Sequence, residues 1–201
     1  MTFIKFCGMT REDDLATATA LGVDAVGFVL WPNSPRAIPR DRLPVLVKTL
    51  PAAVLPVAVF VQPTEDDIGF ALDSGVRALQ VHGVGAQDVM TTIVPTWIGA
   101  RLEGDGIAPD VPKMIPIVLD AHDPVRHGGT GRTIDWDRAA KVAAARRVLL
   151  AGGLTPANVG DAIRTVRPYG VDVASGIEDR PGIKNAQAMQ AFVSAVRDAD
   201  E

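Results

Sequence analysis

The sequence predicts an α/β protein, a single (β/α)8 barrel formed by one domain over residues 1–201. Three observations favour this fold. Short apolar runs alternate with amphipathic stretches along the whole chain. The runs are continuously apolar, which is typical of parallel strands covered by helices. There are eight of them, the number that closes such a barrel. A chain of 201 residues with 47% hydrophobic content can form one sizeable core.

Each apolar run has the length of a strand and is bounded by turn-forming residues. In chain order the runs are FIKF (3–6), AVGFVL (25–30), LPVAVFV (55–61), ALQVH (78–82), WIGARL (97–102), MIPIVLD (114–120), RVLLA (147–151) and VDVAS (171–175). An open doubly wound sheet fits the same alternation and is the competing fold. The count of eight favours the closed barrel.

Helical periodicity fills most of the intervals between the strands. We expect helices at about 11–21, 40–49, 64–73, 85–93, 135–145, 157–167 and 185–199. Thr10, Thr64 and Asp135 stand where a side-chain N-cap would begin a helix. The fifth interval, residues 103–113, holds too much Gly and Pro for a regular helix. We therefore expect the fifth outer helix to be reduced or missing.

Charge and composition point to a small-molecule partner. The net charge is −4 and no basic cluster is present, so nothing favours a nucleic acid or an anionic membrane surface. The longest apolar run, residues 52–61, is too short to cross a bilayer and contains Pro56. A single cysteine and a start without a long apolar stretch argue against a secreted protein. We expect a cytoplasmic protein with no membrane partner.

In a (β/α)8 barrel, the active site lies at the C-terminal ends of the strands and in the loops that follow. The polar side chains of this sequence collect at those positions. They are Cys7 after the first strand, Arg36 after the second, His82 at the end of the fourth and Asp120 at the end of the sixth. The predicted site therefore combines side chains that lie far apart in the chain.

Glycine-rich loops in the last third of the chain predict an anion site. The segments are 128–131 (GGTG), 152–153 (GG) and 175–176 (SG). Glycine lets backbone N–H groups approach an anion closely, and the last two loops form the phosphate site of many barrels. One Gly-Gly pair alone would indicate only a tight turn. Since neither a Walker A sequence nor a G-x-G-x-x-G fingerprint is present, a sugar phosphate is favoured over a nucleotide.

Six segments resemble, in order, the successive signatures of the phosphoribosylanthranilate isomerase family. They are IKFCGMT, GFVLWPNSPRAI, LQVHG, LDAHDPVRHGGTGRTIDW, LAGGLTPANV and GVDVASGIEDRPGIKN, between residues 4 and 185. The resemblance implies a (β/α)8 barrel that carries out an Amadori rearrangement in tryptophan biosynthesis with neither a metal nor an organic cofactor. Its substrate would be a phosphorylated aminosugar, and the enzyme would be a monomer or a homodimer.

The same resemblance implies roles for individual residues. Cys7 would be the general base, Asp120 the general acid, and Arg36 the group that faces the substrate carboxylate. The remaining substrate-binding positions would be His82, Asp172, Gly129, Gly152, Gly153, Ser175 and Gly176. Three positions depart from the family pattern, because Gln62, Ala174 and Asn185 stand where Asn, Ser and Asp are usual.

The reaction itself requires an acid and a base. Opening a ribosylamine ring needs a proton on the ring oxygen, and moving the double bond needs a proton removed from the neighbouring carbon. Cys7 and Asp120 end the first and sixth strands, so they would face each other across the barrel mouth. Lys5 shares the inward face with Cys7 and could favour the thiolate. Desolvation at the edge of the apolar interior could help Asp120 keep its proton.

Each of these residues also has a structural alternative. Cys7 could be ordinary buried packing, Asp120 a helix cap or loop anchor, Arg36 a surface residue, and Lys5 the partner of an interior carboxylate such as Asp172. Two functional alternatives remain as well. One is a metal-dependent sugar-phosphate epimerase with His82 and Asp120 as ligands, and the other is a non-catalytic sensor of a phosphorylated ligand. The irregular spacing of the histidines disfavours a metal site.

Overall fold

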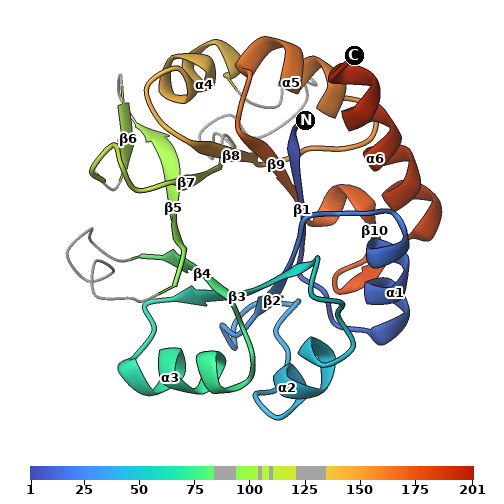
Figure 1. Ribbon diagram of the computed structural model, residues 1–201. Coiled ribbons are helices and arrows are strands. Elements are labelled where there is room, and N and C mark those ends of the chain that lie inside the picture. Colours follow the sequence, from blue (N-terminus) through green and yellow to red (C-terminus); the bar gives the residue numbers. More distant parts are fainter. Residues whose placement is uncertain (84–93, 104–105, 109–110, 121–134) are drawn as a thin grey trace.

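The computed structural model describes residues 1–83, 94–103, 106–108, 111–120 and 135–201. Eight parallel strands form a closed ring (Figure 1). They are β1 (Phe3–Cys7), β2 (Ala25–Val29), β3 (Leu55–Val61), β4 (Ala78–His82), β5 (Thr96–Glu103), β7 (Ile117–Asp120), β8 (Val148–Ala151) and β9 (Gly170–Val173). Because β9 pairs with β1 and β4 pairs with β5, the ring closes. The predicted barrel is confirmed, and the open sheet is wrong.

Helices surround this ring on its outer side (Figure 1). They are α1 (Glu12–Ala20), α2 (Arg42–Val47), α3 (Glu65–Asp73), α4 (Trp136–Ala143), α5 (Val159–Val166) and α6 (Ala186–Ala199). All six lie inside the ranges that the periodicity predicts. The predicted helix at 85–93 lies outside the described residues.

Two of the three predicted helix caps are confirmed. The Thr64 hydroxyl accepts a hydrogen bond from the backbone N–H of Asp67 within a capping box, and the Asp135 carboxylate accepts one from Arg138. The Thr10 prediction is wrong. Helix α1 has Arg11 at its N-cap without a side-chain bond, because the Thr10 hydroxyl instead donates to the carbonyl of Gly182 in the loop after β9.

The fifth connection departs from the β/α alternation, as expected. Strand β6 (Gly106–Ala108) runs back antiparallel to β5, and the described residues between β5 and β7 include no helix. The guanidinium of Arg146 holds the segment before β7 by donating hydrogen bonds to the carbonyls of Val111, Pro112 and Ile115. The prediction of a reduced or missing fifth outer helix is confirmed for the described part of the connection.

The inside of the barrel changes from apolar to polar along its axis. Alternate residues of each strand point inward, and seven of them form an apolar cluster that lies mainly toward the N-terminal ends of the strands, except for Ala151 at the end of β8. Its buried members are Ala25, Val57, Ala78, Trp97, Val118, Leu149 and Ala151. The buried residues Lys5 and Gln80 are the middle residues of β1 and β4, and Asp172 is in register with Lys5. Polar side chains inside the ring therefore begin at the middle of the strands.

After β9, the chain makes a short excursion before α6. It forms a 3-10 turn, η2 (Ser175–Ile177), and a small antiparallel pair, β10 (Glu178–Arg180) and β11 (Ile183–Lys184). This segment carries several charged side chains next to the end of β1.

Within the described residues, every helix falls short of the length and apolarity that a membrane span requires.

Candidate active site

Cys7 is the last residue of β1 and is almost completely buried, with 9% of its surface exposed. Strand alternation puts it on the same inward face as Lys5. Gly27 on the neighbouring strand leaves room for both, since a β-carbon there would lie 3.0 Å from Cys7 Sγ and 3.1 Å from Lys5 Nζ. The predicted placement of Cys7 and Lys5 on one inward face is therefore confirmed.

The electrostatic consequence differs from the expectation for Cys7. Burial raises the pKa of the Cys7 thiol above its ordinary value, and the charges of Lys5 and Lys184 reduce this rise without cancelling it. The negative charge of Asp172 acts in the same direction as burial. Lys5 thus favours the thiolate, as expected, but its effect on the pKa of Cys7 is smaller than the effect of burial.

Lys5 has a carboxylate partner, Asp172 on β9. Lys5 Nζ lies 2.8 Å from the Asp172 carboxylate, and the two side chains are 0% and 8% exposed. Burial is the largest single influence and lowers the pKa of Lys5, but the charges and hydrogen bonds of Asp172 and Cys7 together outweigh it and raise the pKa. The structure contains both alternatives for this lysine, because Lys5 pairs with an interior carboxylate and also acts on Cys7.

His82 is the last residue of β4, and its side chain packs against the neighbouring strand β5. Its ring covers Gly99 of β5, where a β-carbon would lie 2.0 Å from Nδ1. Burial, together with the charge of Lys5, lowers the pKa of His82, while Asp172 and Asp120 oppose this change. Charges on three other strands therefore act on His82, and the net effect disfavours its protonation.

Gln80 is a site residue that sequence reasoning missed. Its amide nitrogen lies 2.9 Å from Nε2 of His82, and the side chain is buried. Its Oε1 has no hydrogen-bond partner among the described residues. The signal was available, because Gln80 stands two residues before His82 on one strand and so shares its inward face.

Asp120 is the last residue of β7, in register with Arg101 of β5 and Ala151 of β8. Two strands, β8 and β9, separate β7 from β1 on one side of the ring. Strands β1 and β7 lie on different sides of the ring (Figure 1), so Cys7 and Asp120, which end these strands, stand on different sides of the barrel mouth, as predicted. Asp120 is exposed, so the expectation that the apolar interior would desolvate it is wrong.

Arg36, in the loop after β2, has an ion-pair partner within the protein. Its Nε lies 2.9 Å from Oε1 of Glu178, and its Nη2 lies 2.7 Å from Oε2. The Glu178 side chain is only 3% exposed. Arg36 also senses the charge of Cys7, so the two predicted site residues are neighbours. Arg36 is therefore not a plain surface residue.

Lys184 completes a buried charge cluster with Arg36 and Glu178. Its ammonium group donates to Oε1 of Glu178 at 2.8 Å and to the carbonyls of Cys7 at 2.6 Å and Ala174 at 3.1 Å. Burial lowers the pKa of Lys184, and Glu178 limits the effect. Sequence reasoning assigned no role to Glu178 or Lys184, although both lie in the charged segment after β9.

The loops after β8 and β9 lie against each other. A β-carbon at Gly176 would be 1.9 Å from the carbonyl oxygen of Leu154, so only glycine fits this contact. Gly152 and Gly153 have φ values of 89° and 67°, the left-handed region that glycine adopts without strain. The Asn158 amide donates to the Gly153 carbonyl at 3.0 Å and holds this turn.

The predicted phosphate-site residues thus converge, with Gly153 and Ser175 exposed at the surface. Gly129, the remaining predicted member, lies outside the described residues. The other two histidines of the chain, His122 and His127, which entered the metal-site alternative with His82, also lie outside them. Among the described residues, no group of three or more His, Cys, Asp or Glu side chains is placed to hold a metal ion.

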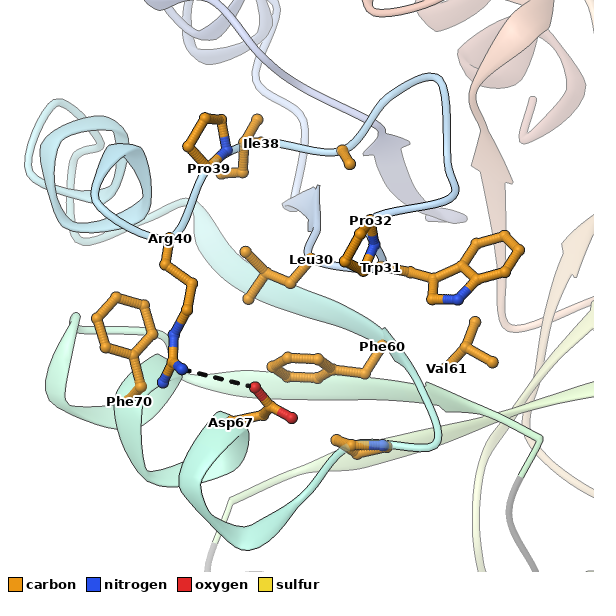
Figure 2. A pocket seen from close by; sticks show the side chains of 12 residues that line it. Leu30, Trp31, Pro32, Ile38, Pro39, Arg40, Phe60, Val61, Asp67 and Phe70 are labelled. Atoms are coloured by element: carbon orange, nitrogen blue, oxygen red, sulfur yellow. Dashed lines mark ion pairs between the residues drawn. The ribbon is translucent and has the colours of Figure 1, made fainter.

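A pocket of about 490 Å³ lies beside the mouth, where β2, β3 and α3 meet (Figure 2). Its walls include Phe60 and Phe70, and the guanidinium of Arg40 lies 4.4 Å above the Phe70 ring and 3.9 Å from Asp67. None of the described residues that the sequence predicts for the site lines this pocket. The predicted chemistry belongs to the barrel mouth instead.

Comparison with known proteins adds independent findings. A sequence profile of the family described as N-(5′-phosphoribosyl)anthranilate isomerase matches residues 4–195. An enzyme of that name from Chromohalobacter salexigens is 42% identical over 202 residues, covering 97% of this chain and 94% of its own.

Two solved structures are also similar. TrpF from Jonesia denitrificans has a TM-score of 0.85 and 35% identity, covering 100% of this chain and 98% of its own. A phosphoribosylanthranilate isomerase in complex with reduced 1-(o-carboxyphenylamino)-1-deoxyribulose 5-phosphate has a TM-score of 0.84 and 29% identity, covering 98% and 100%.

Proposed function

Because this chain belongs to the N-(5′-phosphoribosyl)anthranilate isomerase family, we propose which of its side chains carry each step of that reaction. The enzyme converts N-(5′-phosphoribosyl)anthranilate into 1-(o-carboxyphenylamino)-1-deoxyribulose 5-phosphate, an Amadori rearrangement of tryptophan biosynthesis. Family membership favours this activity over the epimerase and the sensor.

The first step requires an acid, and we assign it to Asp120. Its carboxyl group would deliver a proton to the ring oxygen of the ribosylamine. The bond from that oxygen to the first sugar carbon then breaks, and the nitrogen lone pair forms a carbon–nitrogen double bond. The position of Asp120 at the end of β7, where it influences His82 across the mouth, supports this assignment.

The second step requires a base, and we assign it to Cys7. The thiolate would remove the proton from the second sugar carbon. The electron pair of that C–H bond would form a double bond between the first and second sugar carbons, and the pair of the carbon–nitrogen double bond would return to the nitrogen. The enol formed in this way becomes the ketone of the product by proton transfer. The position of Cys7 on the inward face, beside the Lys5 ammonium group and away from β7, supports this role.

The ends of the substrate would be held by the loops. Arg36 would contact the ring carboxylate, since a guanidinium matches a carboxylate in two-point geometry. The phosphate would lie at Gly152, Gly153, Ser175 and Gly176, with Gly129 as a further contact. The close contact of Gly176 with Leu154 supports one shared site for these loops. His82 and Asp172 would face the sugar from the interior.

The observation that carries this proposal is the convergence of Cys7, Arg36 and the glycine loops on one rim of the barrel, with Asp120 facing Cys7. A direct test mixes the purified protein with freshly formed phosphoribosylanthranilate and follows the loss of its fluorescence. We expect rapid loss that EDTA does not slow. Loss of activity on chelation would favour the metal-dependent epimerase. The expected cytoplasmic location, the single domain and the choice between monomer and homodimer stay predictions.

A further inference from the structure

One buried carboxylate, that of Glu178, receives hydrogen bonds from three residues in two separate segments of the chain. Arg36 of the loop after β2 donates through Nε and Nη2, Lys184 of β11 donates through Nζ, and Gly182 donates its backbone N–H at 3.2 Å. Burial by itself would raise the pKa of Glu178, but the bonds from Arg36 and Lys184 lower it. The carboxylate is therefore charged, fully bonded and shielded from water.

Lys184 extends this arrangement to the backbone of the site. Its side chain is 0% exposed, and its three N–H groups match three acceptors, Glu178, the Cys7 carbonyl and the Ala174 carbonyl. Cys7 ends β1, and Ala174 immediately precedes the proposed phosphate-binding turn. The Glu178–Lys184 pair thus joins the proposed base to the loop after β9.

The bonds to Glu178 also fix the orientation of Arg36. The bonds to Glu178 use the N–H groups of Nε and Nη2 on one edge of the guanidinium. Nη1, on the other edge, has no bond to any described residue. A guanidinium is planar, so fixing one edge fixes the direction of the other. The stem of Arg36 lies directly over the backbone next to Cys7, where a β-carbon at Gly8 would be 2.6 Å from Arg36 Cδ.

We propose that Glu178 is a positioning residue for the isomerisation, which aims the free edge of Arg36 at the ring carboxylate of the substrate and, through Lys184, holds the backbone of Cys7. Glu178 does not itself touch the substrate. The inference rests on the proposed contact of Arg36 with that carboxylate. Because buried ion pairs contribute little net stability compared with apolar packing, a positioning role accounts for this one better than stability does.

The test is a double-mutant cycle on Arg36 and Glu178. Kinetics are measured for the wild type, Glu178→Gln, Arg36→Lys and the double variant, with the folded fraction determined by circular dichroism. We expect Glu178→Gln to raise KM by about tenfold or more, since it removes charged hydrogen bonds. In the Arg36→Lys background it should add less than about threefold, because residues that act through one another are not additive.

Glu12→Gln is the matched control, because Glu12 also pairs with an arginine, Arg42 at 2.8 Å, but on the exposed surface. It should leave KM unchanged. Should Glu178→Gln fail to fold, Glu178→Asp keeps the charge and shortens the side chain by one carbon. It should raise KM for the same reason, because it can no longer reach both Arg36 and Lys184.

Binding gives a readout that a merely structural role would not change. The probes are the reduced product analogue and the same compound without its ring carboxylate. Glu178→Gln should weaken the first by about tenfold and the second by less than threefold. Equal weakening of both probes, or full additivity in the double variant, would overturn the positioning role.

An unchanged KM in Arg36→Lys would instead identify a failure of the proposed carboxylate contact. If Glu178→Gln still raised KM in that case, Glu178 would not act through Arg36, and the inference would be wrong as well. An effect of Arg36→Lys without any effect of the Glu178 variants would overturn the inference alone.

Discussion

The ammonium group of Lys5 lies 2.8 Å from the carboxylate of Asp172, inside the barrel and on the same inward face as Cys7. The two residues are also paired in register between β1 and β9. This pair lies between the apolar cluster inside the barrel and the polar residues at the C-terminal ends of the strands. The pair also affects the pKa of Cys7, because the negative charge of Asp172 opposes the effect of the positive charge of Lys5.

Breaking this pair should destabilise the protein strongly. Lys5→Met leaves Asp172 buried without its partner, and removal of one member of a buried ion pair costs about 3–5 kcal/mol. The double variant Lys5→Met with Asp172→Leu should recover much of that loss because no charge remains buried. Urea unfolding measures both. A double variant no more stable than Lys5→Met would show that the unpaired charge of Asp172 does not cause the loss of stability.

The state of the Cys7 thiol can be followed by alkylation as a function of pH. Because burial raises the pKa of Cys7, the reaction with iodoacetamide should have its midpoint above the ordinary thiol pKa of about 8.5. Bound product analogue should slow the reaction. In Lys5→Met the midpoint should move higher still, since Lys5 lowers the pKa of Cys7. A midpoint below about 8 in the free enzyme would contradict the role of burial.

The stability contribution of Glu178 should depend on pH in a defined direction. Its pKa in the folded protein is lowered, so folding is favoured by ionisation. This contribution is fully present above the unfolded pKa of about 4.3 and disappears as pH falls through the lower folded value. The difference in unfolding free energy between wild type and Glu178→Gln should therefore be largest near pH 7 and shrink below about pH 4. A constant difference from pH 7 to pH 3 would contradict this.

The phosphate assignment makes a prediction at Gly153. Gly153→Val introduces a β-branched side chain at a positive φ of 67° and into the proposed anion site. We expect a large increase in KM for the substrate and loss of competitive inhibition by inorganic phosphate. The matched control is Gly69→Val in α3, where a β-carbon meets nothing within 4 Å. Unchanged saturation in a folded Gly153→Val variant would remove phosphate from these loops.

The fold was largely predictable because it depends on patterns that survive in a single sequence. Continuous apolar runs identified all eight barrel strands, and the glycine and proline content of residues 103–113 indicated the missing helix. Thr10 shows the limit of such local signals. It has the side chain of an N-cap, but a tertiary contact with the loop around Gly182 uses its hydroxyl instead.

The site was predictable to the extent that it follows from position on the barrel. Strand ends located Cys7, His82 and Asp120 without any knowledge of distances. The partners of Arg36 were not predictable, because Glu178 lies 142 residues away in sequence and meets Arg36 only through the fold of the last loop. The rise in the pKa of Cys7 was missed for a related reason, since it results from burial outweighing two nearby lysines.

The most direct test of the account is the turnover of Cys7→Ala, with Asp120→Asn measured beside it. A positioned proton-transfer group contributes about 10² to 10⁴ in rate. Each variant should therefore lose at least about a hundredfold in kcat per folded molecule, while circular dichroism shows an intact barrel. If Cys7 were only a buried packing residue, Cys7→Ala would lose stability and keep its turnover. A folded Cys7→Ala enzyme with nearly wild-type kcat would contradict the proposed mechanism.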